Sequence, residues 1–194
     1  MSFGVSLGAW HDEGVDDRAL IRAVLAGERD QFEILVERET PTIYRACLRI
    51  LGDRGEAEDV TQEAFIAAFR AMRSYRGEGS LRAWLLRIAT RLAFRRLAQR
   101  RPADPLDHVI HDRPGDPRLE PAGAVVAAEQ RHAVRDAVAS LPDQYREVVA
   151  LRFFGELSLA EVADSTGRPL NTVKTHLRRG LERLQPLLTN GGDR

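Results

Sequence analysis

The stretch SLAEVADSTGRPLNTVKTHLRRGLERL, residues 158–184, decides the fold of the C-terminal part of the chain. Ser158 and Glu161 have the spacing of a capping box, in which both side chains bond backbone N–H groups at the start of a helix. The turn that follows this short helix contains Gly167, and a longer helical pattern comes after it. A short helix, a glycine turn and a longer second helix are the layout of a helix-turn-helix.

The second helix is expected to begin with a cap at Asn171 or Thr172 and to end near Leu188. At about 100° per residue, its apolar side chains share one side; they are Val173, Leu177, Leu181 and Leu184. The opposite side carries Thr175, Arg178, Arg179 and Glu182, with Lys174 at the border. Arginine bonds guanine edges or grips phosphate. The pattern therefore favours a DNA-binding helix over a plain helical hairpin with a basic solvent face.

The overall composition limits the class of protein. The chain has 194 residues, 43% of them hydrophobic, which suits one or two small domains and excludes collagen-like and wholly disordered chains. A single cysteine, Cys47, allows no internal disulfide and no multi-cysteine zinc site. The longest uncharged apolar run, residues 122–128, is far shorter than the ~20 residues of a membrane span. No secretory signal is evident, so the cytoplasm is the expected compartment.

Charge is strongly segregated along the chain, although 29 basic side chains balance 29 acidic ones. Residues 1–69 have a net charge of −7, whereas residues 70–101 carry 10 basic side chains and 1 acidic one, a net charge of +9. Such a dense arginine block is typical of a surface that meets phosphate. From charge alone, a solubilising helix surface that pairs with the acidic N-terminal part is equally open.

The N-terminal part also follows helical periodicity. Pro41 stands where a new helix is expected to start, because proline is favoured at a first helical position. A helix over about residues 56–73 has acids in its first turns and arginines in its last, which matches the helix dipole. Ser80 is expected to cap a further helix over about residues 81–100.

The helix expected over residues 81–100 has two faces as well. Its packed stripe consists of Leu81, Trp84, Leu85, Ile88 and Leu92. Arg87, Arg91 and Phe94 are expected on the opposite side, and Tyr75 and Arg76 lie in the turn just upstream. Aromatic rings stack on unpaired bases while guanidinium groups bind the backbone. This mixture predicts contacts with single-stranded nucleic acid.

Five of the nine prolines fall within residues 102–121, with aspartates between them, and this composition predicts a linker. We therefore expect an all-α protein with two helical domains joined by a Pro-rich linker. The expected division is an N-terminal extension (1–24), a first domain (25–101), the linker (102–127), a second domain (128–188) and a tail (189–194).

Several segments together resemble a known family. EDVTQEAFI (58–66), SYRGE (74–78) and AWLLRIA (83–89) closely resemble domain 2 of the bacterial extracytoplasmic-function (ECF) sigma factors. Residues 140–152 and 157–177 resemble their domain 4, and both parts occur in the expected order with the linker between them. The resemblance implies a domain 2 helical bundle and a domain 4 helix-turn-helix. It also implies a specificity subunit of RNA polymerase that has no catalytic site.

The resemblance assigns three sets of contact residues. Asp59, Gln62, Glu63 and Phe65 correspond to the surface that binds the clamp helices of the largest subunit of core RNA polymerase. The promoter −10 element is assigned to Tyr75, Arg76, Arg87, Arg91, Phe94 and Arg95. The −35 element is assigned to Asn171, Thr172, Lys174, Thr175, Arg178 and Arg179. The resemblance further implies a contact with the flap of the second-largest subunit, regulation by an anti-sigma factor, and no cofactor or metal.

Two positions depart from the family pattern. Family members usually have asparagine where this chain has Arg91, and that asparagine helps to hold a flipped −10 base. Asn171 replaces a common glycine, a change of small consequence because asparagine caps helices well. Base selection at the −10 element is therefore left open by the sequence.

Two other classes of protein compete with the sigma factor interpretation. A repressor or activator with the same helix-turn-helix would account for residues 128–188 but would leave the motifs of residues 56–96 without a role. An enzyme would need a site, and His108, His111 and Asp112 are the nearest to a metal-ligand spacing. They lie in the proline-broken linker, however, without a third fixed ligand or a nearby base.

Overall fold

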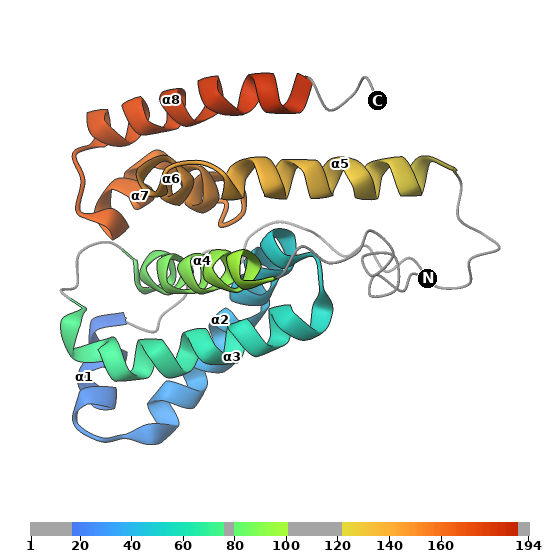
Figure 1. Ribbon diagram of the computed structural model, residues 1–194. Helices are drawn as coiled ribbons and strands as arrows, with labels where there is room; N and C mark the ends of the chain where they lie inside the picture. Colours follow the sequence, from blue (N-terminus) through green and yellow to red (C-terminus); the bar gives the residue numbers. More distant parts are fainter. Residues whose placement is uncertain (1–16, 76–79, 101–121, 190–194) are drawn as a thin grey trace, which may run out of the picture.

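The computed structural model describes residues 17–75, 80–100 and 122–189, and every regular element in these ranges is a helix (Figure 1). The first group comprises α1 (Asp17–Leu25), α2 (Arg29–Leu51), α3 (Arg54–Ala71), the 3₁₀ helix η1 (Met72–Ser74) and α4 (Leu81–Gln99). The second group comprises α5 (Ala122–Ala139), α6 (Asp143–Phe153), α7 (Leu159–Thr166) and α8 (Leu170–Thr189). The all-α expectation is confirmed. None of these helices is long and apolar enough to cross a bilayer.

The first group forms a bundle in which α2, α3 and α4 pack against one another and α1 packs against α2. All of helix α1 except Leu25 lies within the residues expected to form an extension, yet it buries Leu20, Ile21 and Val24 in the common core. Its apolar side chains recur at helical spacing, the pattern of an amphipathic helix. The bundle therefore includes α1.

Polar caps set the ends of the helices in this bundle. The Asp53 side chain accepts a hydrogen bond from the backbone N–H of Glu56 at 2.8 Å, so α3 begins two residues before the expected start. Gly52 ends α2 in the left-handed conformation, with φ 70°. Ser80 accepts from the N–H of Ala83 at 3.1 Å, which confirms the expected cap of α4.

The expectation that Pro41 begins a new helix is wrong, because α2 runs through it without interruption. Proline removes one backbone hydrogen bond from a helix interior. Packing offsets this cost: Leu35, Ile43 and Ile50, on both sides of the proline, are at most 1% exposed. A single long helix buries all three in one core, which two separate helices would not do as simply.

The helix-turn-helix forms as the sequence predicts, with one shift. Ser158 and Glu161 make both bonds of the capping box, and Gly167 turns the chain with φ 65°. The carbonyl of Pro169 already accepts from the N–H groups of Thr172 and Val173, at 2.8 and 3.1 Å. Helix α8 therefore begins at Leu170, and the expected cap at Asn171 or Thr172 is wrong, because these residues lie in the first helical turn.

The packed face of α8 is narrower than the helical wheel predicts. Val173 and Leu184 are buried and Leu177 is half-buried, but Leu181 is 42% exposed. The expectation for Leu181 is wrong because α8 packs mainly on α6, which leaves that side chain beside an open groove. Gly180 is buried on the α6 side, where a Cβ would lie 2.8 Å from Val149 Cγ2.

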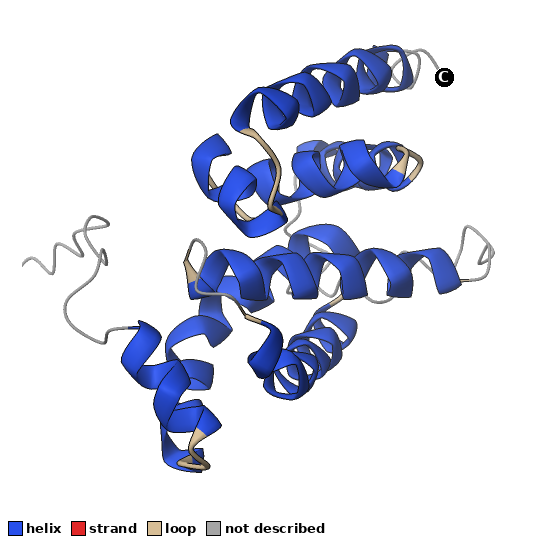
Figure 2. Cartoon of the chain, turned by 90° about the vertical axis from the view of Figure 1, so that its left-hand side faces the viewer, coloured by secondary structure: helices blue, strands red, loops and turns tan. Residues whose placement is uncertain are grey.

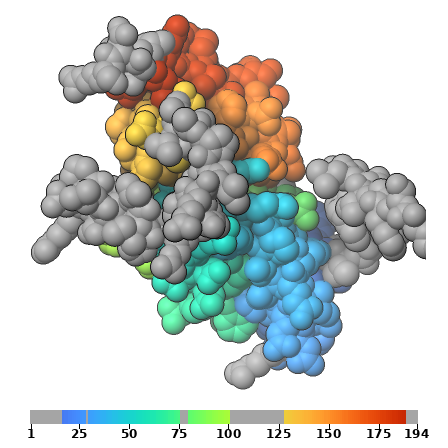
Figure 3. All heavy atoms as spheres, turned by 90° about the vertical axis from the view of Figure 1, so that its right-hand side faces the viewer, coloured from blue at the N-terminus to red at the C-terminus, as the bar shows by residue number. Residues whose placement is uncertain are grey.

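The second group of helices lies directly on the first. Helix α4 packs against α6 and α7 as well as against α2 and α3. The turned views show the two groups one above the other and in direct contact (Figures 2 and 3). Residues 101–121, the main part of the expected linker, lie outside the described residues, and α5 begins at Ala122, before the expected end of that linker.

Candidate nucleic-acid interface

The polar face of α8 is open to solvent. Lys174, Arg178 and Arg179 are all exposed, and they lie within two turns of one another. Arg178 pairs with Glu182 one turn later, and their side chains are 64% and 55% exposed. An exposed pair of this kind contributes little to stability, so the guanidinium group can exchange its partner readily. This face presents cationic donors of the kind that read a DNA major groove.

The first turns of α8 add hydroxyl and amide groups to this face. Asn171 is exposed, and Thr172 and Thr175 are half-buried. The Thr175 hydroxyl donates to the Asn171 carbonyl at 2.9 Å, which leaves its oxygen able to accept a further bond. All six residues assigned to the −35 element therefore come from the first three turns of a single helix.

The C-terminal side of this face contacts α6. A hydrogen bond from Arg179 lowers the pKa of the Tyr145 hydroxyl, and the Arg183 guanidinium lies 5.2 Å from the centre of the Tyr145 ring. Partial burial, with Arg168 and Arg179 nearby, lowers the pKa of His176. His176 is therefore mainly neutral at pH 7, and the positive charge of this region comes from arginine and lysine.

An apolar groove runs beside the same helix. It has a volume of about 540 Å³ and is lined by Leu159, Lys174, Leu177, Arg178, Leu181, Glu182 and Gln185. Three of the lining residues are leucines and three are charged, so the groove is bordered by apolar and charged side chains. Helix α8 thus carries an apolar surface next to its basic one.

The face of α4 that was expected to bind DNA is partly covered. Arg91 and Arg95 are exposed, but Arg87 is half-buried. Arg87 Nε donates to Glu147 Oε1 of α6 at 2.8 Å, and its Nη1 donates to the Ser165 carbonyl of α7 at 3.0 Å. Contacts from the second group of helices thus occupy this arginine.

Glu147 joins both groups of helices. Its second oxygen pairs with Arg168 Nη2 at 2.8 Å, in the turn that leads into α8. Burial alone would raise the pKa of Glu147, but Arg87 and then Arg168 outweigh it and lower the pKa. The carboxylate is therefore ionised at neutral pH and bridges α4 to the helix-turn-helix.

Phe94 is 8% exposed, so the expectation that it lies on the open side of α4 is wrong. Its ring centre lies 6.2 Å from that of Phe154, and the Arg146 guanidinium lies 5.6 Å above the ring. Both partners belong to the second group of helices. An isolated helical wheel treats this side as open, but the second group of helices covers it.

Tyr75 directly follows η1, and its ring contacts the ring of Trp84 near the start of α4. Its ring centre lies 5.3 Å from that of Trp84, and the ring is half-buried. Burial raises the pKa of its hydroxyl, which is therefore protonated at neutral pH. Arg76, the other residue expected in this turn, lies outside the described residues.

A second candidate interface lies on α3. Asp59, Gln62 and Glu63 are exposed on one stripe, and Glu63 pairs loosely with Arg96 of α4 at 3.5 Å. Phe65 does not belong to this stripe: it is 6% exposed and faces the core, because its position on the helix matches that of the buried residues Val60, Thr61, Ala64 and Ala68. A direct contact between Phe65 and a partner would need the bundle to open.

Two exposed apolar residues complete the stripe and were missed from the sequence. Ile66 is 52% exposed and Phe69 is 46% exposed. Phe69 makes an edge-to-face contact with Phe32 of α2 at 4.9 Å. The signal was available, because both residues follow Gln62 at the i+4 and i+7 spacing of one helix face.

Within the described ranges, no three histidine, cysteine or acidic side chains lie close enough together to bind a metal ion. The spacing considered for a metal site, His108, His111 and Asp112, falls outside these ranges. Cys47 is fully buried, and burial raises the pKa of its thiol to about 11. It is therefore a core residue with little thiolate character.

Comparison with known proteins decides the family. Residues 35–102 match Sigma-70 region 2, and residues 131–184 match Sigma-70 region 4. The ECF RNA polymerase sigma factor SigW of Bacillus subtilis is 35% identical over 176 residues, which cover 87% of this chain and 94% of that protein. The chain belongs to the ECF sigma factors. The expectation drawn from the sequence motifs is confirmed, and this sigma factor belongs to a family that is non-catalytic.

Other relatives agree. The sigma factor is 34% identical to the RNA polymerase sigma-H factor of Pseudomonas aeruginosa over 89% of this chain and 95% of that protein. It is 31% identical to the ECF RNA polymerase sigma-E factor of Escherichia coli, over 91% of this chain and 98% of that protein. Its fold is similar to that of CnrH, which was solved in complex with the cytosolic domain of CnrY. The TM-score is 0.59 and the sequence identity is 23%, and the match covers 90% of this chain and 97% of CnrH.

Proposed function

We propose that this sigma factor binds core RNA polymerase through α3, reads the −35 element with α8 and opens the −10 element with α4 and Tyr75. The observation that carries the proposal is the exposed basic face of α8, on the second helix of a capped helix-turn-helix, in a chain that belongs to the ECF family. The first group of helices, α1 to α4, then acts as domain 2, and the second group, α5 to α8, as domain 4, so that each domain begins before the bounds of 25–101 and 128–188 expected from the sequence.

Six residues of α8 read the −35 element in this proposal. Lys174, Arg178 and Arg179 supply charge-assisted bonds to bases and phosphates, and exposure of all three supports this role. Asn171, Thr172 and Thr175 add amide and hydroxyl groups near the start of the helix. The start of the recognition helix is the part that contacts base edges in helix-turn-helix proteins.

The side chains of domain 2 that are proposed to bind the −10 element are of two kinds, exposed and covered. Arg91 and Arg95 are exposed and able to bind phosphate as the structure stands. Arg87 and Phe94 become available only when α4 separates from domain 4. Tyr75 supplies a stacking surface for an unpaired base. Arg76, the next residue along the chain, is also proposed to contact the −10 element.

The polymerase surface has a charged part and an apolar part. Asp59, Gln62 and Glu63 supply polar contacts to the clamp helices of the largest subunit, and exposed Ile66 and Phe69 supply the apolar centre that a stable interface needs. This replaces Phe65 as the aromatic contact. The apolar groove beside α8 supports a further contact with the flap of the second-largest subunit.

We infer two further properties from the relatives. CnrH was solved with the cytosolic domain of CnrY, and the sigma factor RpoE of Bartonella quintana was solved with the anti-sigma factor NepR. An anti-sigma factor is accordingly proposed as a partner of this chain. Because its polymerase partner works in the cytoplasm, we place the sigma factor there too.

The proposal is tested by mixing the purified chain with bacterial core RNA polymerase and genomic DNA. We expect co-elution with the polymerase and transcripts that begin at a defined set of sites. Phe69→Ala removes the apolar centre of the α3 surface, and we expect it to weaken polymerase binding by roughly tenfold, the effect of truncating a residue at the centre of an interface. Ile34→Ala, also exposed but on α2, is the matched control. Tight duplex binding without any polymerase association would favour a repressor or activator instead.

A further inference from the structure

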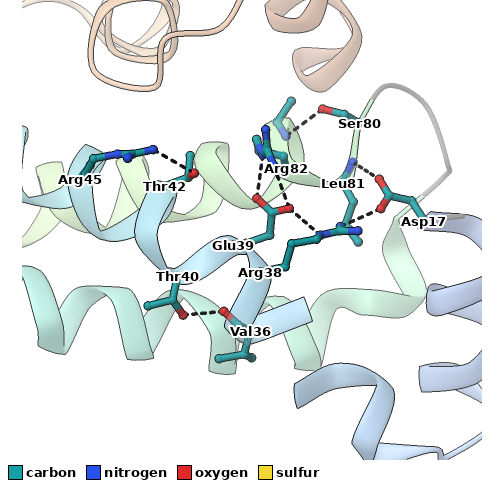
Figure 4. A network of polar contacts seen from close by, with 11 residues as sticks. Asp17, Val36, Arg38, Glu39, Thr40, Thr42, Arg45, Ser80, Leu81 and Arg82 are labelled. Atoms are coloured by element: carbon teal, nitrogen blue, oxygen red, sulfur yellow. Dashed lines mark hydrogen bonds and ion pairs between the residues drawn. The ribbon is translucent and has the colours of Figure 1, made fainter. Parts of the chain in front are cut away.

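Glu39 of α2 is a buried carboxylate inside domain 2, with a side chain that is 1% exposed. Its Oε1 accepts a hydrogen bond from Arg38 Nε at 2.8 Å, and its Oε2 accepts one from Arg82 Nε at 2.8 Å (Figure 4). Removing charges from water costs free energy, so a buried ion pair often stabilises a fold no more than apolar side chains would. A role in fixing the geometry explains this group better than a contribution to stability.

The network extends from α1 to the start of α4. Arg38 Nη2 donates to Asp17 Oδ1 at 2.8 Å, and Asp17 Oδ2 accepts from the backbone N–H of Leu81 at 3.2 Å (Figure 4). Arg82, the partner of Glu39, is the next residue along the chain. Two carboxylates from α1 and α2 therefore hold the first turn of α4, one through its backbone and one through a side chain.

The same turn of α4 contains Trp84, and the ring of Tyr75 packs against the Trp84 ring. The backbone N–H of Trp84 donates to the Ser80 carbonyl at 3.2 Å, so the backbone of Trp84 belongs to the capped turn that Asp17 holds. The Tyr75 and Trp84 ring centres lie 5.3 Å apart. The carboxylates of Asp17 and Glu39 are thus connected to the Tyr75 ring through the backbone of the first turn of α4 and the contact between the Trp84 and Tyr75 rings.

We propose that Asp17 and Glu39 are positioning residues for capture of the −10 strand. They set the orientation of the Tyr75–Trp84 pair through the first turn of α4. Neither carboxylate binds DNA itself, since an anion would repel the phosphate backbone. The inference rests on the proposed function, which assigns Tyr75 to the −10 element. A side chain that is displaced by about 1 Å stacks poorly on an unpaired base and therefore captures the melted strand less well.

The experiment measures promoter opening by the holoenzyme formed with bacterial core RNA polymerase. The probe is a promoter fragment whose start site has been mapped with the wild-type chain, with 2-aminopurine in the −10 region. We expect Asp17→Asn and Glu39→Gln each to lower the opening rate at saturating holoenzyme by about tenfold, the effect of losing a charge-assisted bond. The holoenzyme concentration at half-maximal rate stays unchanged. Glu37→Gln, an exposed carboxylate of α2, is the control and should open the promoter like wild type.

A second measurement separates positioning from a loss of stability. In a Tyr75→Ala background, Glu39→Gln should add less than about a twofold effect, because both changes act through the same ring. A merely structural role would lower the rate equally in both backgrounds and would also weaken polymerase binding. Asp17→Glu keeps the carboxylate and should recover part of the rate. If Glu39→Gln does not fold, Arg82→Lys tests the same contact with the charge retained.

The outcomes distinguish this inference from the proposed function. If the wild-type holoenzyme opens no promoter, the proposed function fails. If it does, but Asp17→Asn and Glu39→Gln match Glu37→Gln, the positioning inference is overturned and the function stands. If Tyr75→Ala opens the promoter at the wild-type rate, the −10 assignment of Tyr75 and the inference built on it both fail.

Discussion

The two candidate DNA faces have similar chemistry but different surroundings. On α8, Lys174, Arg178 and Arg179 all face solvent. On α4, Arg87 and Phe94 pack against domain 4. Both helices carry arginines opposite an apolar stripe, so their sequences alone predict two open faces. The difference shows that the residues proposed to read the −35 element are accessible in this arrangement, whereas two of those proposed for the −10 element become accessible only when the domains separate.

The contact that covers α4 is of moderate strength. Arg87 makes a charge-assisted bond to Glu147 across this contact, and such a bond is worth about 1.5–3 kcal/mol in general. The bond between Glu147 and Arg168 lies within domain 4 and does not oppose separation of the domains. The pair between Arg49 and Glu156 spans the same interface, but its side chains are 41% and 64% exposed, and such pairs contribute little. We expect binding to the polymerase to supply the free energy that separates the domains.

The largest effect is expected on the open face. Arg178→Ala and Arg179→Ala should each lower promoter-specific transcription by roughly 5- to 160-fold, since a base-reading arginine contributes about 1–3 kcal/mol. Run-off transcription on promoters with intact and altered −35 elements measures this. Arg22→Ala, an exposed arginine of α1, removes the same charge and should change little. Unchanged promoter selectivity in both α8 variants would contradict the −35 assignment, and α8 would then no longer be a candidate DNA face.

The covered face should respond to a change in domain 4. Glu147→Gln removes the charge that holds Arg87, so α4 should separate from α6 more often. We expect the affinity for a single-stranded −10 oligonucleotide to rise by about tenfold, the value of one charge-assisted bond. Small-angle scattering should show a larger radius of gyration. Glu156→Gln, which loses only the exposed pair, is the control. An affinity and a radius equal to those of wild type would show that the bond does not restrict access to α4.

Acid should open the same contact over a defined range of pH. The pKa of Glu147 is lowered from 4.5, so its stabilising charge is fully present above that pH and is lost as the pH falls through the lowered pKa. Scattering from pH 8 to 3 should show a constant radius down to about pH 4.5, then an increase before domain 2 unfolds. In Glu147→Gln this step should be absent. An increase in the radius centred above about pH 5 would show that a group other than Glu147 controls the opening.

The smallest effect is expected on α8 and in a different pH range. The pKa of His176 is lowered from 6.5, so the unfolded chain binds the proton first, and domain 4 loses stability as the pH falls below 6.5. Hydrogen exchange of α8 amides should therefore increase slightly between pH 6.5 and 5, after correction for intrinsic rates. His176→Gln should abolish this dependence. An equal increase in α4 would mean that the two faces do not respond to acid separately.

Local signals were sufficient for most of the secondary structure. The capping box of Ser158 and Glu161, the turn at Gly167 and the cap at Ser80 are contacts between residues a few positions apart. They were predicted correctly because their partners are contained in the same short stretch. The exposed stripe of α3 was equally accessible, although Ile66 and Phe69 were passed over in favour of buried Phe65.

The sequence by itself determined the helices, the helix-turn-helix and the family, because caps, periodicity and motifs depend on neighbours along the chain. Only the tertiary structure decided which helix faces remain open. Arg87 and Glu147 are 60 residues apart in sequence, and Asp17 and Leu81 are 64 apart. A helical wheel contains no information about partners so distant, because packing against another element, not the helix itself, removes a face from water. The same chemistry is therefore exposed on α8 and partly covered on α4.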